Sequence, residues 1–158
     1  QQSGSYLMTD HRGRVESPEV FDEGAPLLLR EPAIAKTETY LAGLAEHVEV
    51  VWLGPFVEAQ VEFKNLRYLF KQGWVIQDRV IEVFEALDRA LLARFPDGTR
   101  PFEYVSLVDI LGIDRTFLMQ DGCLTYRDID HFSRCGEMIV GAKLAPALRR
   151  EMLLTRAN

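Results

Sequence analysis

Apolar residues along the chain follow two patterns, a helical spacing and short continuous runs. The helical spacing predicts helices over residues 33–47, 75–95 and 133–154. Two nearly continuous apolar runs, residues 48–56 and 102–111, predict strands covered on both faces. Because helices and strands alternate, the pattern predicts an α/β three-layer sandwich in which a parallel sheet is flanked by helices.

The segments between these elements carry turn and loop signals. We expect the end of a short strand at residues 5–9, a long loop at 12–32, a mixture of loop and short helix at 57–74, a turn at 96–101, and two extended pieces around Asp121-Gly122 at 117–126.

Size and charge limit the class of protein. The 158 residues, 47% of them hydrophobic, suit one domain over residues 1–158. The net charge of -6 and the lack of a run of basic residues argue against a nucleic-acid partner. No apolar stretch reaches the roughly 20 residues that span a bilayer. The first residues, QQSGS, do not resemble a signal peptide and do not reveal a location.

Two cysteines, Cys123 and Cys135, lie twelve positions apart. One disulfide and two buried free thiols both fit this count, and the spacing is not that of a zinc site.

The densest group of proton-transferring side chains lies in residues 126–136, YRDIDHFSRCG. In a nucleophilic hydrolase, an imidazole acts as the base and a carboxylate accepts its Nδ1 hydrogen bond. Asp128, three residues before His131, can supply that carboxylate. Alternatively, Asp128 and Asp130 only place negative charge near the start of the last helix, and His131 is a surface residue. The spacing alone leaves both interpretations open.

The wider segment LTYRDIDHFSRCGEMIVGAKL resembles the C-terminal block of the SGNH, or GDSL-type, hydrolase superfamily. The similarity is greatest to the SGNH domains fused to integral-membrane acyltransferases in bacterial envelope sugar O-acetylation. The residues that carry it are Tyr126, Asp128, His131, Ser133 and Gly136, with Phe132 in place of the family's Leu. The resemblance implies that Asp128 orients the imidazole and that His131 is the general base.

Residues 50–56, VVWLGPF, also resemble that family, in which a strand ends before Gly and Pro. Relatives elsewhere in the superfamily carry an oxyanion-hole Asn near this point, whereas here no Asn follows Gly54 until Asn65.

The Gly-Asp-Ser block that holds the family's nucleophile does not occur in this chain, and the nucleophilic Ser is not identified. No serine in the sequence has the strand and turn of a nucleophile elbow. We considered Ser3, Ser5, Ser17, Ser106 in a predicted strand, and Ser133 as the start of the last helix.

Three explanations for the missing nucleophile stay open. The sequence lacks the family's first strand and nucleophile block, another chain or segment supplies them, or the domain is a degenerate relative. The first is favoured because the buried-strand pattern persists while only the N-terminal part of the family pattern is absent.

The resemblance implies a serine-dependent O-acyl (acetyl) transferase or esterase that acts on envelope polysaccharide sugars without a cofactor. Its partners would be an acyl donor, a sugar or polysaccharide acceptor and an integral-membrane acyltransferase domain, in a periplasmic or extracytoplasmic location. The alternative is a catalytically inactive SGNH-like module that binds a glycan or a membrane partner.

Three weaker candidates complete the set. Asp10 and His11 could join Asp128, Asp130 and His131 in a metal site with oxygen and nitrogen ligands. His47 closes a predicted helix and is interpreted as structural. An aromatic run fits the core better than a sugar-stacking groove, and it comprises Phe63, Tyr68, Phe70 and Trp74.

Overall fold

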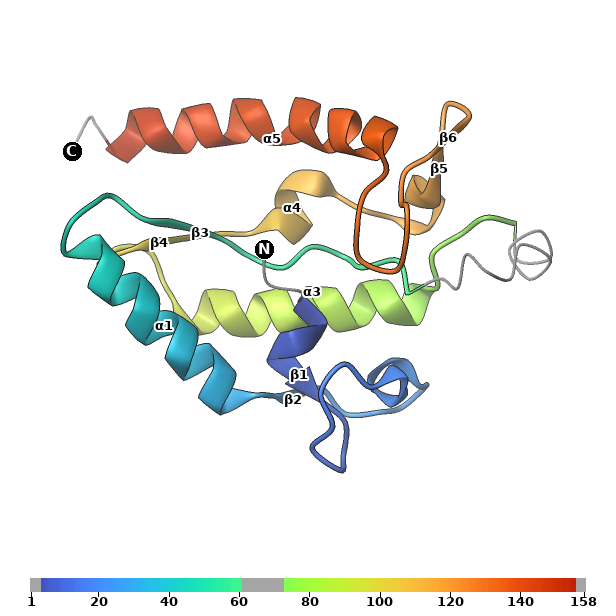
Figure 1. The fold of residues 1–158 in the computed structure, drawn as a ribbon, viewed down its shortest axis with the longest axis horizontal. Helices are drawn as coiled ribbons and strands as arrows, with labels where there is room; N and C mark the ends of the chain where they lie inside the picture. Colours follow the sequence, from blue (N-terminus) through green and yellow to red (C-terminus); the bar gives the residue numbers. More distant parts are fainter. Residues whose placement is uncertain (1–3, 61–72, 156–158) are drawn as a thin grey trace.

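The computed structural model describes residues 4–60 and 73–155, with side chains up to residue 149, and has a mixed α/β fold (Figure 1). Its long helices are α1 (Glu31–Ala45), α3 (Asp78–Arg94) and α5 (Arg134–Thr155). They confirm the three helices predicted from apolar spacing. None of the helices in these described ranges is long and apolar enough to cross a membrane.

The strands are short and pair two by two. The parallel pair joins β3 (Val51–Leu53) to β4 (Glu103–Val105), with Trp52 opposite Tyr104. Parallel strands need a long connection, and the chain between β3 and β4 contains α3 (Asp78–Arg94). The antiparallel pairs are β1 (Met8–Thr9) with β2 (Leu28–Leu29), and β5 (Met119–Gln120) with β6 (Cys123–Leu124). The last pair confirms the two extended pieces expected around Asp121-Gly122.

The segments expected at 102–111, 5–9 and 12–32 differ from the structure. The strand predicted at residues 102–111 ends at Val105, and Leu107–Leu111 forms the short helix α4. The strand ends before Ser106 because the Ser106 side chain caps this helix. Its Oγ atom accepts a hydrogen bond from Asp109 N at 3.0 Å. At the N-terminus, the 3-10 turn η1 (Gly4–Leu7) takes most of the expected strand at 5–9, and the loop at 12–32 contains β2 and the 3-10 turn η2 (Pro18–Phe21).

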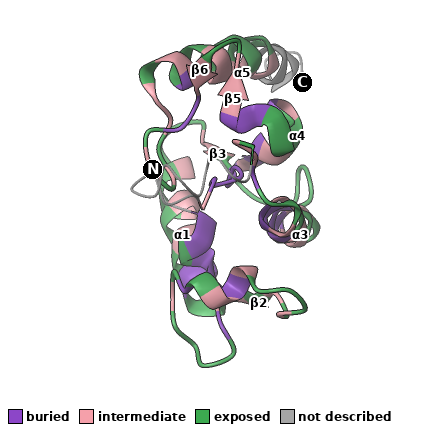
Figure 2. Cartoon of the chain, turned by 90° about the vertical axis from the view of Figure 1, so that its right-hand side faces the viewer, coloured by how far each residue is buried: buried purple, intermediate pink, exposed green. Residues whose placement is uncertain are grey.

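Helices lie on both sides of the parallel pair. In Figures 1 and 2, α4 and α5 lie on one side of β3, and α1 and α3 lie on the other. Buried residues concentrate where these elements face one another (Figure 2). The most deeply buried large side chains include Ile34, Phe84, Leu87, Leu111, Leu118 and Tyr126.

One edge of β3 has no strand partner among the described residues. Val50 O and Gly54 N bond to β4. Because backbone groups alternate in direction along a strand, the N–H and C=O groups of Val51 and Leu53 point away from β4. A cavity of about 530 Å³ lies beside this edge, with Leu53, Phe132 and Leu144 among its lining residues.

A buried polar cluster joins α3 to β4 and α4. Asp88 accepts hydrogen bonds from Tyr104 Oη and Ser106 Oγ, both at 2.7 Å. No sequence pattern predicted this role for Asp88, which is only 2% exposed. Burial raises its pKa, although both hydroxyls oppose this. A Cβ atom at Gly54 would lie 2.2 Å from Tyr104 Oη, so this glycine leaves room for the cluster.

Candidate catalytic site in the Asp128–His131 loop

The candidate site lies at the tip of a small hairpin between β6 and α5. Tyr126 and Phe132 form an antiparallel bridge, and Arg127 N donates to His131 O at 2.8 Å. Tyr126 is fully buried, and its hydroxyl donates to Val57 O in the segment after β3. Phe132 stacks on Phe56, with ring centroids 4.7 Å apart. The core therefore fixes the base of the tip, which spans residues 127–131.

Ser133 and Gly136 begin α5. Ser133 Oγ accepts from Gly136 N at 3.1 Å and donates to Leu124 O at 2.6 Å. These bonds confirm Ser133 as the start of the last helix. A Cβ atom at Gly136 would lie 1.9 Å from Thr125 O, so a glycine is required where the helix crosses β6.

A disulfide between Cys123 and Cys135 closes the same segment, with Cα atoms 6.3 Å apart. Of the two alternatives left open by the sequence, the structure therefore has the disulfide rather than free thiols. Both Asp128 and His131 lie inside the ring that it closes.

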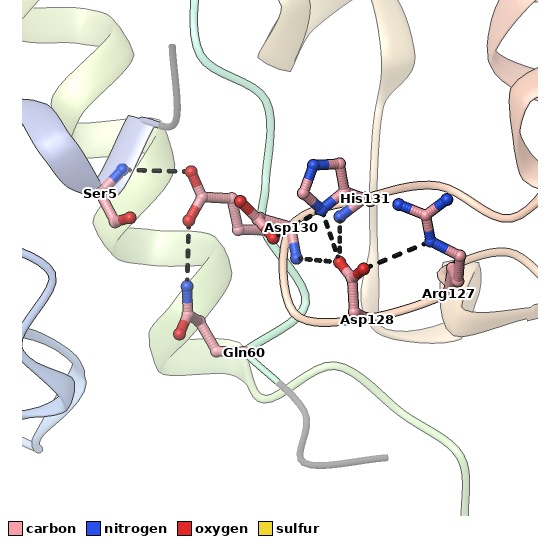
Figure 3. A network of polar contacts seen from close by, with 7 residues as sticks. Ser5, Gln60, Arg127, Asp128, Asp130 and His131 are labelled. Atoms are coloured by element: carbon pink, nitrogen blue, oxygen red, sulfur yellow. Dashed lines mark hydrogen bonds and ion pairs between the residues drawn. The ribbon is translucent and has the colours of Figure 1, made fainter. Parts of the chain in front are cut away.

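Asp128 and His131 meet as their spacing suggests. Asp128 Oδ1 lies 2.8 Å from His131 Nδ1 and also accepts from His131 N at 2.9 Å and Asp130 N at 3.3 Å (Figure 3). Asp130 Oδ1 is 2.9 Å from the same Nδ1 atom. Arg127 Nε lies 3.3 Å from the other oxygen of Asp128. The sequence suggested that Asp130 is a metal ligand or a helix-end charge, but it did not indicate the contact with the ring.

These contacts shift both pKa values. Partial burial opposes ionisation of Asp128, but hydrogen bonds from His131 and from the backbone outweigh it and lower its pKa to about 2. The pKa of His131 is raised, first by its hydrogen bond to Asp128 and then by the charge of Asp130. The imidazolium form is therefore favoured.

The other ring nitrogen of His131 is open. The side chain is 57% exposed, and no described residue contacts Nε2. When carboxylates hold the proton on Nδ1, the lone pair of the neutral ring lies on Nε2. That atom can accept a proton from a group brought to the surface of the loop, which is the geometry of a general base.

No described serine hydroxyl contacts His131. Ser5 is buried, and its backbone N–H donates to Glu58 Oε1 at 3.1 Å. Glu58 also accepts from Gln60 Nε2 at 3.1 Å, and Figure 3 shows Ser5 and Gln60 apart from the imidazole. Ser106 and Ser133 are helix caps, and Ser17 is buried before η2. Ser3 and Asn65 lie outside the described residues.

The structure separates the five candidate metal ligands into two groups. Asp128, Asp130 and His131 place ligand atoms within 4.8 Å of one another. Asp10 instead accepts from Arg14 Nε at 2.7 Å, and His11 lies near Glu19.

The sequence also suggested roles for His47 and for an aromatic run. His47 follows the end of α1, and its backbone N–H donates to Leu44 O. Of the aromatic run, Phe63, Tyr68 and Phe70 lie outside the described residues, and Trp74 packs against the core.

No protein-family model matches this sequence, and comparisons with curated proteins and with solved structures find no match.

Proposed function

We propose that the Asp128–His131 loop is the general-base half of an SGNH-type site and that the protein transfers an O-acyl group, acetyl in the simplest case. The acceptor is a hydroxyl of an envelope polysaccharide sugar, or water in an esterase reaction. One observation carries the proposal: Asp128 contacts Nδ1 of His131 at 2.8 Å while Nε2 is exposed and has no partner among the described residues.

The structural roles of the other motif residues support this function. Tyr126 anchors the loop in the core, Ser133 caps α5, and Gly136 allows the helix to start against Thr125 O. Each of these residues acts on the placement of Asp128 and His131. The motif residues therefore fix the conformation of the loop that holds the His131 imidazole.

In the proposed reaction, a serine hydroxyl attacks the carbonyl carbon of an acyl ester while His131 Nε2 takes its proton. The resulting imidazolium is stabilised by the carboxylates at Nδ1. Nε2 then returns the proton to the leaving oxygen, which leaves an acyl-serine. A sugar hydroxyl or water repeats the two steps in the second half of the reaction. The serine is proposed to come from a Gly-Asp-Ser block outside these 158 residues.

The complete fold in this proposal is a three-layer α/β sandwich of the SGNH or flavodoxin type. Two observations support it. Helices lie on both sides of the β3–β4 pair, and the second edge of β3, which pairs with no strand in the described part of the chain, lies beside a cavity of about 530 Å³. A further parallel strand, carrying the nucleophile at its end, would pair along this edge.

The proposed location is extracytoplasmic, beside an integral-membrane acyltransferase domain. The Cys123–Cys135 disulfide supports it, because disulfides persist mainly in oxidising compartments.

Active-site labelling tests the function in the polypeptide that naturally contains residues 1–158. We expect a fluorophosphonate probe to label one serine, and His131→Gln to abolish labelling and lower the hydrolysis of acetyl esters by about 10⁴-fold or more. His47→Gln is the matched control, because His47 lies at the end of α1, outside the loop, and should leave both readouts unchanged.

Labelling that persists in folded His131→Gln protein would contradict the proposal. So would the absence of both labelling and ester hydrolysis in the wild-type polypeptide. The second function, a non-catalytic module that binds a glycan, would then be preferred. One observation favours it now, since no described serine hydroxyl contacts His131.

A further inference from the structure

His131 Nδ1 lies between two carboxylates. Asp128 Oδ1 is 2.8 Å away and Asp130 Oδ1 is 2.9 Å away, so both are at hydrogen-bond distance from one nitrogen. The nitrogen carries a single hydrogen, which is bonded to Asp128, whereas Asp130 forms an ion pair with the charged ring. The usual arrangement of a hydrolase has one carboxylate at this position.

The two carboxylates differ in what else they bind. Asp128 Oδ1 accepts from the backbone N–H groups of Asp130 and His131 and so shapes the turn. The carboxylate of Asp130 contacts only the imidazole among the described residues. Asp128 therefore holds both the loop and the ring, whereas Asp130 acts on the ring alone.

We propose that Asp130 is a second positioning residue for His131. Its ion pair at Nδ1 stabilises the charged ring, and its carboxylate holds the ring in the same tautomer when the Asp128 carboxylate is removed. The consequence for catalysis rests on the function proposed above, but the ion pair itself does not. The other charged groups in this network are Arg127 on the loop and Glu58 in the segment after β3.

Titration of the His131 ring by NMR, with a chelator present, tests the effect of each carboxylate in wild type, Asp128→Asn, Asp130→Asn and the double variant. We expect the His131 pKa to fall in Asp130→Asn and to fall furthest in the double variant, because each carboxylate favours the charged ring. Arg127→Gln is the matched control on the same loop. It removes a positive charge and should move the pKa in the opposite direction.

A His131 titration curve in Asp130→Asn that matches wild type would overturn the proposal, as would identical curves for Asp128→Asn and the double variant. If Asp128→Asn disorders the turn, seen as faster amide exchange at residues 127–131, the Asp130→Asn comparison decides alone.

Activity provides an independent readout. With one carboxylate, replacing Asp by Asn costs about 10⁴-fold in kcat because the ring takes the wrong tautomer. Here Asp128→Asn should lose less than this, and the double variant should lose the full amount. Equal losses in the two variants would contradict a role for Asp130. If the titrations behave as expected but wild type has no esterase or transferase activity, the proposed function fails and the positioning role of Asp130 stands.

Discussion

Asp88 and Asp128 are both hydrogen-bonded aspartates, but their surroundings give them opposite properties. Asp88 is almost fully buried and receives hydrogen bonds from two neutral hydroxyl groups, and its pKa is raised. Asp128 is half exposed and bonds to backbone N–H groups and an imidazole, and its pKa is lowered to about 2. Burial thus favours the neutral form of Asp88, which has a structural role. Water and the donors around Asp128 instead keep it ionised and able to stabilise an imidazolium.

Alanine substitution should separate the two aspartates most clearly. Asp88→Ala leaves the hydroxyls of Tyr104 and Ser106 without their acceptor in the core, and we expect a loss of about 3 kcal/mol in the free energy of unfolding. Asp128→Ala should lose much less, because water can replace its carboxylate. Urea denaturation of both variants measures the difference, and equal losses would break the comparison.

A glycine at the candidate site gives the next largest effect. Gly136→Ala places a Cβ atom 1.9 Å from Thr125 O, so α5 must shift, and we expect a loss of about 2 kcal/mol. Gly141→Ala, in the same helix, meets no atom within 4 Å and should be neutral or stabilising. Thermal unfolding of the two variants tests this. A Gly136→Ala protein as stable as Gly141→Ala would show that the helix start is not tightly packed.

The smallest expected effect concerns the pH dependence of stability, which should have opposite signs for Asp128 and Asp88. The lowered pKa of Asp128 contributes stability that is present above about pH 4 and is lost as the pH falls towards 2. The raised pKa of Asp88 costs stability as the pH rises above 3.8 through its folded value. The raised pKa of His131 gives stability that is lost as the pH rises from 6.5 through its folded value.

Unfolding free energies measured from pH 2 to 9 check these signs. Asp128→Asn should reduce the loss of unfolding free energy between pH 4 and 2, and Asp88→Asn should reduce the loss above pH 3.8. If the loss at acid pH is unchanged in Asp128→Asn, other carboxylates cause it.

Local patterns in the sequence were enough to predict the long helices, whereas the spacing of Asp128 and His131 allowed their contact without deciding it. The helices follow from apolar spacing, and an Asp three residues before a His in a turn can reach its ring. The strand predicted at 102–111 was wrong beyond Val105 because a continuous apolar run does not distinguish a strand from a short helix. The sequence Ser-Leu-Val-Asp from Ser106 to Asp109 carried the missed helix-start signal.

Long-range contacts could not be predicted in the same way. Position 88 falls on the apolar face of α3, four residues after Phe84 and three before Leu91, but its charge gave no sign of a buried role. Its acceptor role depends on Tyr104 and Ser106, which a sequence pattern does not bring to it. Likewise, the contact of Asp130 with His131 depends on the detailed shape of the turn.

The disulfide gives the chain two covalent routes from β6 to α5, one through the backbone of the loop and one through sulfur. Arg127 is exposed on the backbone route. A protease that cuts after it would open the loop and separate Arg127 from Asp128 and His131, yet α5 would stay attached through Cys123 and Cys135. The cut would add the mass of one water, and only reduction would release the C-terminal piece.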